Sequence, residues 1–521
     1  MSAQDVALLR KHVPDGEVFR LGLRPPSVMV RKPLMLGLPI YYCSTASSLI
    51  ASTHIRLLAA LGVKLKEEQS VLPEFFLYRY VMPPRTLFQD VFCLPLDGNV
   101  RAFVEGDSIA VGEPVWTNVF RKTTTRYGLE ESATRIKEDL ERTVDDLKPH
   151  GDAVGCLMSG GVDSSILYKL CKDRLSLRES HSTGYPFEAE EHNDERKYAE
   201  TASAAFGSKH TYHSFRTQDF LHAVVDATYH AEIPVIAMQS ALLELVFNRG
   251  LAEHLRTVLC GEGADSLFGL PIMYSYHKLR GVTRPALAPV LWLLAHTLKN
   301  RLYPWERMYA FSKRRWDLDF SNVKHGLWLT GEFADKRWVK DRYAVDEEAL
   351  LKGRRAIIER FSLDNVFDAF TVLAYVSDAA IIQDIWGKLG DAQGRWICYP
   401  FNSPELIRVA HHTSWDDKMS VHKRLIRRAG QLVGVPDPIL FRPKLTFGIS
   451  ARQWAAPGGV LEALFRVASP VVESDVLRRF LSPDEKRAMT GWTLVNYAIW
   501  KRMLIDGEPP ERLHAELQGS P

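Results

Sequence analysis

Residues Ala153–Leu170 read AVGCLMSGGVDSSILYKL and combine a strand, a turn and a helix start in one short stretch. The apolar run Ala153–Met158 predicts a buried parallel strand. Ser159–Ser165 predicts a glycine-rich turn, and Ile166–Leu170 predicts the first turns of a helix. Glycines let backbone N–H groups point inward and a helix N-terminus adds partial positive charge, so the stretch favours a bound phosphate. The alternative is a plain strand-to-helix turn made of small residues.

Asp163 is not explained by phosphate binding alone, because a carboxylate repels phosphate. A divalent cation between the carboxylate and the phosphates would account for it. A second glycine-rich loop, CGEGADSLFG, spans Cys260–Gly269, and its Asp265 could complete the same cation site. Taken alone, that loop could equally be a turn with solvated acids. A third loop, RPKLTFG, carries Lys444, which is either an ordinary loop cation or a group that neutralises phosphate charge.

Composition indicates an ordinary globular protein of 521 residues with 46% hydrophobic residues, 25% charged residues and a net charge of +3. That balance gives no reason to expect a nucleic-acid partner. Six scattered cysteines without a Cys-x-x-Cys pair favour buried thiols in a reducing compartment. The N-terminus lacks a signal-peptide core, and no apolar run is long enough for a membrane span, so we expect a cytoplasmic protein. The longest apolar run, Ala286–Leu298, predicts a core helix or, alternatively, a docking surface.

Two regions of different pattern divide the chain. Residues 1–128 are β-rich, although Ser47–Leu61 has helical spacing. Residues 129–521 begin with alternating strands and helices up to about residue 270 and then become almost wholly helical. The alternation predicts an α/β fold with a doubly wound parallel sheet, and ligands are expected at the carboxyl ends of its strands. The strands expected after the first are Ser180–Tyr185, His210–Phe215 and Arg256–Cys260.

The three loops together resemble the motifs of a known family. SGGVDSS resembles the pyrophosphate loop of the N-type ATP pyrophosphatases and is not a Walker A loop, because no Gly-Lys-Ser/Thr follows its glycines. CGEGADSLFG and RPKLTFG, followed by Trp454, are similar to motifs of the asparagine synthetase class, which includes β-lactam synthetases and lasso-peptide cyclases. Further similar segments are DERKYA at 194–199, Tyr399-Pro400-Phe401, the Trp492, Asn496 and Trp500 helix, and MPPRTLF at 82–88.

The resemblance implies an ATP-pyrophosphatase sheet with a helical C-terminal extension at 129–521. It also implies a degenerate glutaminase-like domain of the N-terminal nucleophile hydrolase type at 1–128. The implied cofactors are ATP and Mg²⁺, with Asp163 and Asp265 on the metal. Glu262 matches the position tied to acyl-adenylate formation, and Lys444 matches a lysine that contacts the phosphates. Pyrophosphate would be bound by Ser159, Gly160, Gly161, Ser164 and Ser165, and the nucleotide by the backbone of Met158, Thr183, Cys260 and Gly261.

Several positions depart from the family patterns. Ser2-Ala3 follows Met1 where glutamine-dependent members have a cysteine nucleophile, and the strands before Leu34 are shortened. We therefore expect no glutaminase activity, and free ammonia or an amine as the nitrogen donor. Ser266 replaces a glutamate, and Trp396 stands where asparagine synthetases have another glutamate. β-Lactam synthetases use a tyrosine–glutamate dyad. In this sequence Glu262 stands at the position of that tyrosine, and Asp384 is the nearest candidate for the glutamate.

These features predict an ATP-dependent amide-forming ligase that adenylates a carboxylate and couples it to an amine. We expect a role in specialised-metabolite, antibiotic or peptide macrolactam biosynthesis, since neither the aspartate pattern nor the β-lactam pattern is intact. The inserted segment Leu270–Phe320 could shape a larger pocket or dock a carrier or leader-peptide-binding protein, and we also consider a homodimer. The alternatives are an ammonia-dependent asparagine synthetase and a non-catalytic nucleotide-binding scaffold.

Overall fold

The computed structural model describes residues 19–23, 26–45, 47–117, 119–121, 123–185, 194–279, 287, 289–290, 293, 335–363, 365–442 and 451–518. Most of the apolar run 286–298, predicted as a core helix or alternatively a docking surface, and Lys444 lie outside these residues. Within the described part of the chain, no helix has the length and apolarity needed to cross a lipid bilayer. The expected location in the cytoplasm stays a prediction.

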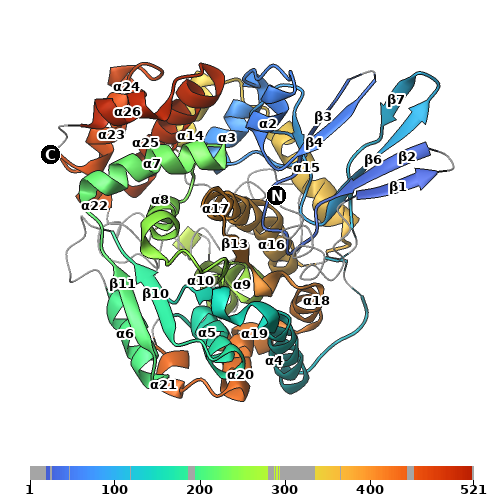
Figure 1. The fold of residues 1–521 in the computed structure, drawn as a ribbon, viewed down its shortest axis with the longest axis vertical. Coiled ribbons are helices and arrows are strands. Elements are labelled where there is room, and N and C mark those ends of the chain that lie inside the picture. The colour runs from blue at the N-terminus through green and yellow to red at the C-terminus, as the bar shows by residue number, and fades with distance from the viewer. Residues whose placement is uncertain are drawn as a thin grey trace.

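A five-stranded parallel sheet forms the framework of the α/β unit, and Figure 1 shows two of its strands, β10 and β11, beside α6. Two parallel ladders, β13-β12-β9 and β10-β11, are joined by a parallel bridge between Leu157 and His181, where the Met158 N–H donates to the His181 carbonyl at 2.9 Å. The strand order is therefore β13-β12-β9-β10-β11. The strands are β9 (Val154–Cys156), β10 (Glu179–Thr183), β11 (Lys209–His213), β12 (Thr257–Leu259) and β13 (Trp396–Cys398).

This sheet confirms the predicted α/β class with a parallel sheet and corrects one detail of it. The strands expected near residues 180, 210 and 256 are present as β10, β11 and β12. The region beyond residue 270 was expected to be almost wholly helical, yet Trp396–Cys398 adds the strand β13 next to β12. Three residues are too few to produce a recognisable alternation, and this strand forms because β12 offers it a hydrogen-bonding edge.

Helices cover both faces of the sheet (Figure 1). On one side α4 (Leu129–Asp145), α5 (Val162–Leu175) and α20 (Arg424–Val433) pack on one another. On the other side α7 (Thr217–Ala231), α8 (Gln239–Leu245) and α17 (Ala380–Ala392) do so. The direction of the chain across the sheet reverses after β11, and right-handed crossovers then carry the later helices to the opposite face.

Two antiparallel sheets precede this α/β unit. One has the order β1-β2-β6-β7, with β8 also pairing with β6, and the other has the order β4-β3-β5. Seven buried side chains form a small core of their own there: Val30, Leu36, Leu38, Ile40, Tyr42, Leu94 and Val100. The strands are β1 (Phe19–Leu23), β2 (Pro26–Arg31), β3 (Tyr41–Ser44), β4 (Leu49–Ser52), β5 (Phe92–Cys93), β6 (Gly98–Glu105), β7 (Ser108–Val111) and β8 (Val115–Trp116).

The helix predicted from the spacing of Ser47–Leu61 is present only in the second half of that segment. Leu49–Ser52 forms β4 against β3, and the helix α2 is confined to Ile55–Ala60. A strand pairing partner therefore overrides the local helical pattern in the first half of the segment. The boundary at residues 128 and 129 stays a prediction.

The α-helices not yet named lie in several parts of the chain, most of them after residue 260. Figure 1 shows α23 to α26 gathered beside α7 and α14. The full set of these not yet named α-helices is α3 (Leu72–Tyr78), α6 (Asp194–Ala205), α9 (Ala264–Phe268), α10 (Pro271–Leu279), α14 (Lys336–Arg342), α15 (Glu347–Arg360), α16 (Val366–Ala374), α18 (Pro404–His412), α19 (Trp415–Met419), α21 (Asp437–Leu440), α22 (Ala451–Trp454), α23 (Val460–Ala468), α24 (Ser474–Phe480), α25 (Glu485–Trp500) and α26 (Pro510–Leu517).

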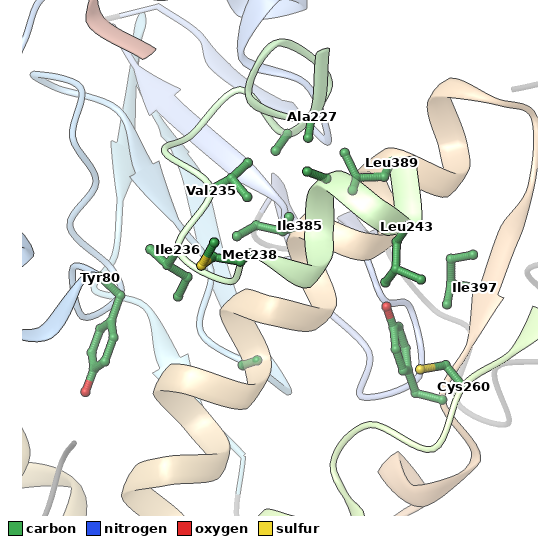
Figure 2. Packing of buried hydrophobic residues seen from close by; sticks show 14 of the residues in the cluster. Tyr80, Ala227, Val235, Ile236, Met238, Leu243, Cys260, Ile385, Leu389 and Ile397 are labelled. Atoms are coloured by element: carbon green, nitrogen blue, oxygen red, sulfur yellow. The ribbon is translucent and has the colours of Figure 1, made fainter. Parts of the chain in front are cut away.

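A continuous apolar core joins the α/β unit to the antiparallel sheets. Figure 2 shows Ile236 and Met238, which follow α7, lying between Tyr80 on one side and Ile385 of α17 on the other. Gly387 of α17 approaches the Gly37 backbone so closely that any side chain at position 387 would overlap the Gly37 carbonyl. The two parts of the molecule therefore fold against each other as one packed body.

Glu232, at the end of α7, holds this junction together with a fully buried carboxylate. It accepts hydrogen bonds from the backbone N–H groups of Ile55 at 2.9 Å and Arg56 at 3.1 Å, which are the first two residues of α2. It also forms ion pairs with Arg56 at 3.0 Å and with the buried Lys388 of α17 at 2.6 Å. Burial raises the pKa of Glu232, but the Lys388 ammonium and these donors outweigh burial and lower that pKa overall.

We predict that Glu232→Ala lowers the free energy of unfolding by about 3–5 kcal/mol, because it leaves the Lys388 ammonium buried without its partner. Urea unfolding followed by circular dichroism measures the change. The matched control is Glu200→Ala, which removes an exposed ion pair with Arg196 and should cost less than about 1 kcal/mol. Equal effects of the two substitutions would contradict the role given to Glu232.

Candidate active site

One cavity of about 460 Å³ opens where the carboxyl ends of β9 and β12 lie side by side. The two strands are adjacent, but the chain leaves them in opposite directions across the sheet, so the cavity stands at the switch point of the strand order. Both glycine-rich loops predicted from the sequence end in it. Of the predicted site residues, Met158, Ser159, Gly161, Asp163, Ser164, Thr183, Cys260, Gly261, Glu262 and Asp265 line it.

The first loop wraps tightly around the N-terminus of α5. The Ser159 hydroxyl accepts the Gly161 N–H at 3.3 Å and lies 3.2 Å from the Ser164 hydroxyl, which also donates to the Gly161 carbonyl. These bonds hold the loop in a concave shape over the first turn of α5, where the helix backbone presents N–H groups that no carbonyl within the helix can reach. The geometry suits a phosphate group.

Gly160 does not line the cavity but fixes the loop from behind. Its φ of +69° belongs to the left-handed region, and an added Cβ would overlap the backbone carbonyl of Tyr198 in α6. The Gly160 carbonyl accepts from Arg442 Nε at 2.7 Å, and the Arg442 guanidinium lies 4.2 Å above the Tyr198 ring. The first loop, α6 and the segment entering RPKLTFG therefore meet at one glycine.

Ser165 lies on the buried face of α5 and does not reach the cavity. Its side chain is fully buried, and its N–H donates to the Gly161 carbonyl at 3.0 Å. The Met158 and Cys260 N–H groups donate to the His181 and Cys398 carbonyls, each at 2.9 Å. A nucleotide contact by the backbone of Met158 or Cys260 would therefore use the carbonyl oxygen.

Asp163 and Asp265 converge from the two loops on the same ammonium group. Lys423 Nζ is ion-paired with both carboxylates, and the Lys423 side chain is only 3% exposed. Burial disfavours its charge, but the attraction of Asp163 and Asp265 is stronger and raises the pKa of Lys423. Two carboxylates that can share one ammonium are close enough to share one metal ion.

The same pair of carboxylates fits a magnesium ion. Carboxylate oxygens are the hard ligands that Mg²⁺ prefers, and one or two of them together with substrate phosphates make a usual site. Asp163 Oδ1 is buried and has no hydrogen-bond partner within the described residues, which leaves it available as a ligand. In the described part of the chain, no group of three or more acidic, histidine or cysteine side chains is arranged to hold a metal ion.

Sequence reasoning missed two of the cations that face this end of the cavity. Lys423 and Arg427 line it, as do their neighbour His422 and Arg442, the first residue of the predicted RPKLTFG loop. The signal for Lys423 and Arg427 was the basic run HKRLIRR at 422–428, which a search for phosphate-binding partners of SGGVDSS could have used. The predicted Lys444 lies just beyond Arg442 in the chain, outside the described residues.

Three titratable groups in or beside the cavity, Tyr375, Cys260 and His181, are held in their neutral forms. Burial and then the Glu262 charge raise the pKa values of Tyr375 and of the Cys260 thiol, so both groups stay protonated. Burial and the neighbouring His213 lower the pKa of His181 to about 4, so its imidazole is neutral at pH 7. Glu262 therefore has two uncharged neighbours, Tyr375 and the Cys260 thiol.

The two positions compared with substrate-side residues of the family do not reach this cavity. Trp396 begins β13, at the end of the strand opposite to the loops. Asp384 forms a buried ion pair with Lys32 of the N-terminal region, with Nζ 2.8 Å from Oδ1, and it lines a separate cavity of about 80 Å³. The idea that Asp384 supplies the acid of a catalytic dyad is therefore not supported by its position.

Comparison with known proteins gives one family. Residues 135–502 match the family model for asparagine synthase. A putative glutamine-hydrolyzing asparagine synthetase of Mycobacterium tuberculosis H37Rv is 25% identical over 483 residues, which cover 86% of this chain and 70% of that protein. Asparagine synthetase B of Escherichia coli K12 is 28% identical over 189 residues, which cover 33% of this chain and 31% of that protein. Asparagine synthetase 1 of Bacillus subtilis 168 is 22% identical over 237 residues, which cover 44% of this chain and 35% of that protein.

We predict that Gly160→Ala weakens ATP binding at least about tenfold, because the added methyl group pushes the first loop away from Tyr198. Isothermal titration with ATP measures the loss. Gly207→Ala is the matched control, since Gly207 has a similar φ of +63° but meets only the tip of Lys172. Unchanged ATP affinity in the Gly160 variant would contradict the phosphate site.

Proposed function

The chain belongs to the asparagine synthase family of ATP-dependent carbon–nitrogen ligases, and we propose that it adenylates a substrate carboxylate and joins it to an amine. The observation that carries this proposal is the convergence of SGGVDSS and CGEGAD on one cavity, with Asp163 and Asp265 sharing Lys423. A site of this kind can hold a triphosphate and an acid together, and such positioning supplies much of the rate of a two-substrate reaction.

The proposed reaction has two steps. A carboxylate oxygen attacks the α phosphorus of ATP, and pyrophosphate leaves with the bonding electron pair. The amine nitrogen then attacks the acyl carbonyl, AMP leaves, and the nitrogen gives up a proton. Glu262 faces the space between the loops and is our candidate for orienting the acyl group and receiving that proton.

The chain's own residues stabilise the phosphates as charge develops. The first loop and the α5 N-terminus would bind the departing pyrophosphate through Ser159, Gly161 and Ser164. Lys423 and Arg442 add positive charge, and we propose that Lys444 does the same from the adjoining loop. Mg²⁺ held by Asp163 and Asp265 would neutralise further negative charge on the triphosphate.

The strand order and the antiparallel sheets support two further parts of the proposal. The order β13-β12-β9-β10-β11, with SGGVDSS at the end of β9, favours the ATP-pyrophosphatase type of α/β fold. The paired antiparallel sheets favour a glutaminase-like origin for residues 1–128, with the synthetase unit at 129–521.

The amine is free ammonia or an amino group of a substrate, and the product belongs to specialised metabolism in our first hypothesis. The second is an ammonia-dependent asparagine synthetase, which the names of the relatives favour. The third is a nucleotide-binding scaffold, and the presence of Asp163, Glu262, Asp265 and Lys423 in the lining of one cavity argues against it.

We expect pyrophosphate and AMP to appear from MgATP only when a suitable carboxylate is added. Asp163→Asn should reduce this release by at least about a hundredfold, because it removes a charge that the metal requires. A coupled pyrophosphate assay with AMP quantified by chromatography measures both. Asp173→Asn, on the exposed side of the same helix, should keep normal activity. Full activity in Asp163→Asn would refute the metal assignment.

Lys444→Ala should lower kcat by about two to three orders of magnitude while ATP affinity changes little, as expected for a group that acts on transition-state charge. Single-turnover kinetics and ATP titration separate the two quantities. Lys209→Ala, which removes an exposed lysine paired with Glu179, serves as the control. If kcat is retained in the Lys444 variant, this lysine has no part in the mechanism.

A further inference from the structure

The second loop carries two acids of the site on either side of one glycine. Glu262 and Asp265 line the cavity, and Gly263 lies between them as the residue that precedes α9. The φ of Gly263 is +97°, which belongs to the region that favours glycine. The direction in which Glu262 enters the cavity therefore depends on what holds this turn in place.

Three buried side chains from later parts of the chain contact this turn. A Cβ added at Gly263 would lie 3.0 Å from both Asn402 Oδ1 and Gln383 Nε2. The same Cβ would lie 3.4 Å from Tyr375 Cε2. Each of the three side chains is at most 2% exposed, and none of them is among the residues that line the cavity. They therefore support the turn from the side that faces away from the substrates.

Asn402 is the centre of this group, because its amide uses all of its hydrogen-bonding capacity. The Asn402 Oδ1 atom accepts from the Tyr375 hydroxyl at 2.6 Å and from Gln383 Nε2 at 3.0 Å. The Asn402 Nδ2 atom donates to Gln383 Oε1 at 2.8 Å and to the Leu34 carbonyl at 3.1 Å. A satisfied buried network of this kind resists displacement, since movement of one member leaves a buried polar group without a partner.

The three side chains come from separate elements that meet behind the second loop. Tyr375 begins the π-helical turn Tyr375–Ala379 between α16 and α17, and Gln383 lies on α17. Asn402 ends the short 3-10 helix that follows β13. Burial, and then the Glu262 charge, raise the pKa of Tyr375, so its hydroxyl keeps the proton that it donates. A π-helical turn inside a longer helix is frequent at functional sites, which fits a role for Tyr375 here.

The N-terminal region supports the network from the other side. Leu34, whose carbonyl accepts from Asn402, follows β2, and Gly37 lies three residues later. A Cβ added at Gly37 would lie 2.8 Å from the ring atom Cε2 of Tyr399. The Tyr399 hydroxyl in turn donates to the Gln383 carbonyl at 3.0 Å. Residues 34–37 are therefore tied to the group that contacts the second loop.

We propose that Asn402, Gln383 and Tyr375 are positioning residues that hold Glu262 toward the acyl group, with residues 34–37 as their support. This inference rests on the proposed function, in which Glu262 orients the acyl group and receives the proton of the amine. A proton acceptor has to lie within hydrogen-bond reach of its donor, so a displaced turn slows the attack of the amine. The N-terminal region thereby has a use that requires no glutaminase activity.

A misplaced Glu262 leaves the acyl-adenylate exposed to water. Water then attacks the acyl carbonyl, AMP leaves, a proton is released and the free carboxylate is formed again. The first step of the proposed reaction continues under these conditions, while the amide is lost. The amount of amide formed for each pyrophosphate released therefore reports the position of Glu262, and a general loss of folded protein does not change that ratio.

The test measures this ratio in variants of the network. A carboxylate that supports pyrophosphate release is supplied with ammonia, unless it carries its own amino nucleophile, and the amide is quantified by mass spectrometry. We expect Asn402→Leu, which keeps a similar volume, to lower the ratio of amide to pyrophosphate at least about fivefold and to change ATP affinity less than about threefold. Tyr375→Phe is a milder change that keeps the ring, and it should lower the ratio about twofold.

Two further variants separate positioning from stability. Thr413→Val is the matched control, because it removes a buried hydroxyl that lies 2.7 Å from the Ser132 hydroxyl, outside the cavity lining. It should lower the thermal stability but keep the ratio. Asn402→Leu combined with Gln383→Leu and Tyr375→Phe replaces the network by apolar groups, so it should regain part of the stability but not the ratio. Recovery of both would overturn the inference.

Crystal structures of the wild type and of Asn402→Leu keep the test independent of catalysis. We expect the Glu262 carboxylate to move by more than about 1 Å relative to Asp163, a shift large enough to affect the rate, while the first loop keeps its place. An unmoved Glu262, or a normal ratio in the Asn402 variant, would overturn the inference. If no carboxylate yields pyrophosphate, the proposed function fails, and the position of Glu262 in the variant then decides whether the network holds the turn.

Discussion

The pairing of β9 with β12 is the constraint on which the rest of the structure depends. These strands lie in register with Cys156 beside Leu259, and the Leu157 N–H donates to the Leu259 carbonyl at 3.2 Å. Their sequences are about a hundred residues apart. Because parallel strands end at the same edge, this pairing brings SGGVDSS and CGEGAD together, and it opens a cavity where the chain diverges. Asp163 and Asp265, one from each loop, can share Lys423 because of that adjacency.

Buried charges set how the antiparallel sheets sit on this unit. Glu232 joins α7, α2 and α17, and Lys32 binds Asp384 across the same junction. Burying an ionic group away from water costs free energy unless the group is paired. An alignment of the two parts that separated the members of either pair would therefore be unfavourable. The polar pairs therefore select the position of the N-terminal sheets, while the apolar core in Figure 2 supplies the attraction.

The cavity divides its chemistry by the two faces of the sheet. The α5 face contributes backbone dipoles, hydroxyl groups and cations, which suit a triphosphate, and the α8 face contributes Leu242, Leu243 and Trp386. Low polarity on one side strengthens the electrostatic contacts on the other, since water screens them less. The apolar face of the cavity thus strengthens the contacts that we propose for the triphosphate on the α5 face.

The sequence by itself determined the parallel α/β unit, its family and the two loops, because a glycine-rich turn between a strand and a helix is encoded by neighbouring residues. It did not reveal that Lys423 bridges Asp163 and Asp265, that Asp384 binds Lys32 instead of serving the site, or that Leu49–Ser52 is a strand. Those outcomes depend on partners that lie far away in the chain. Burial makes an unpaired charge or strand edge too costly to keep, so tertiary structure alone decided which distant groups pair.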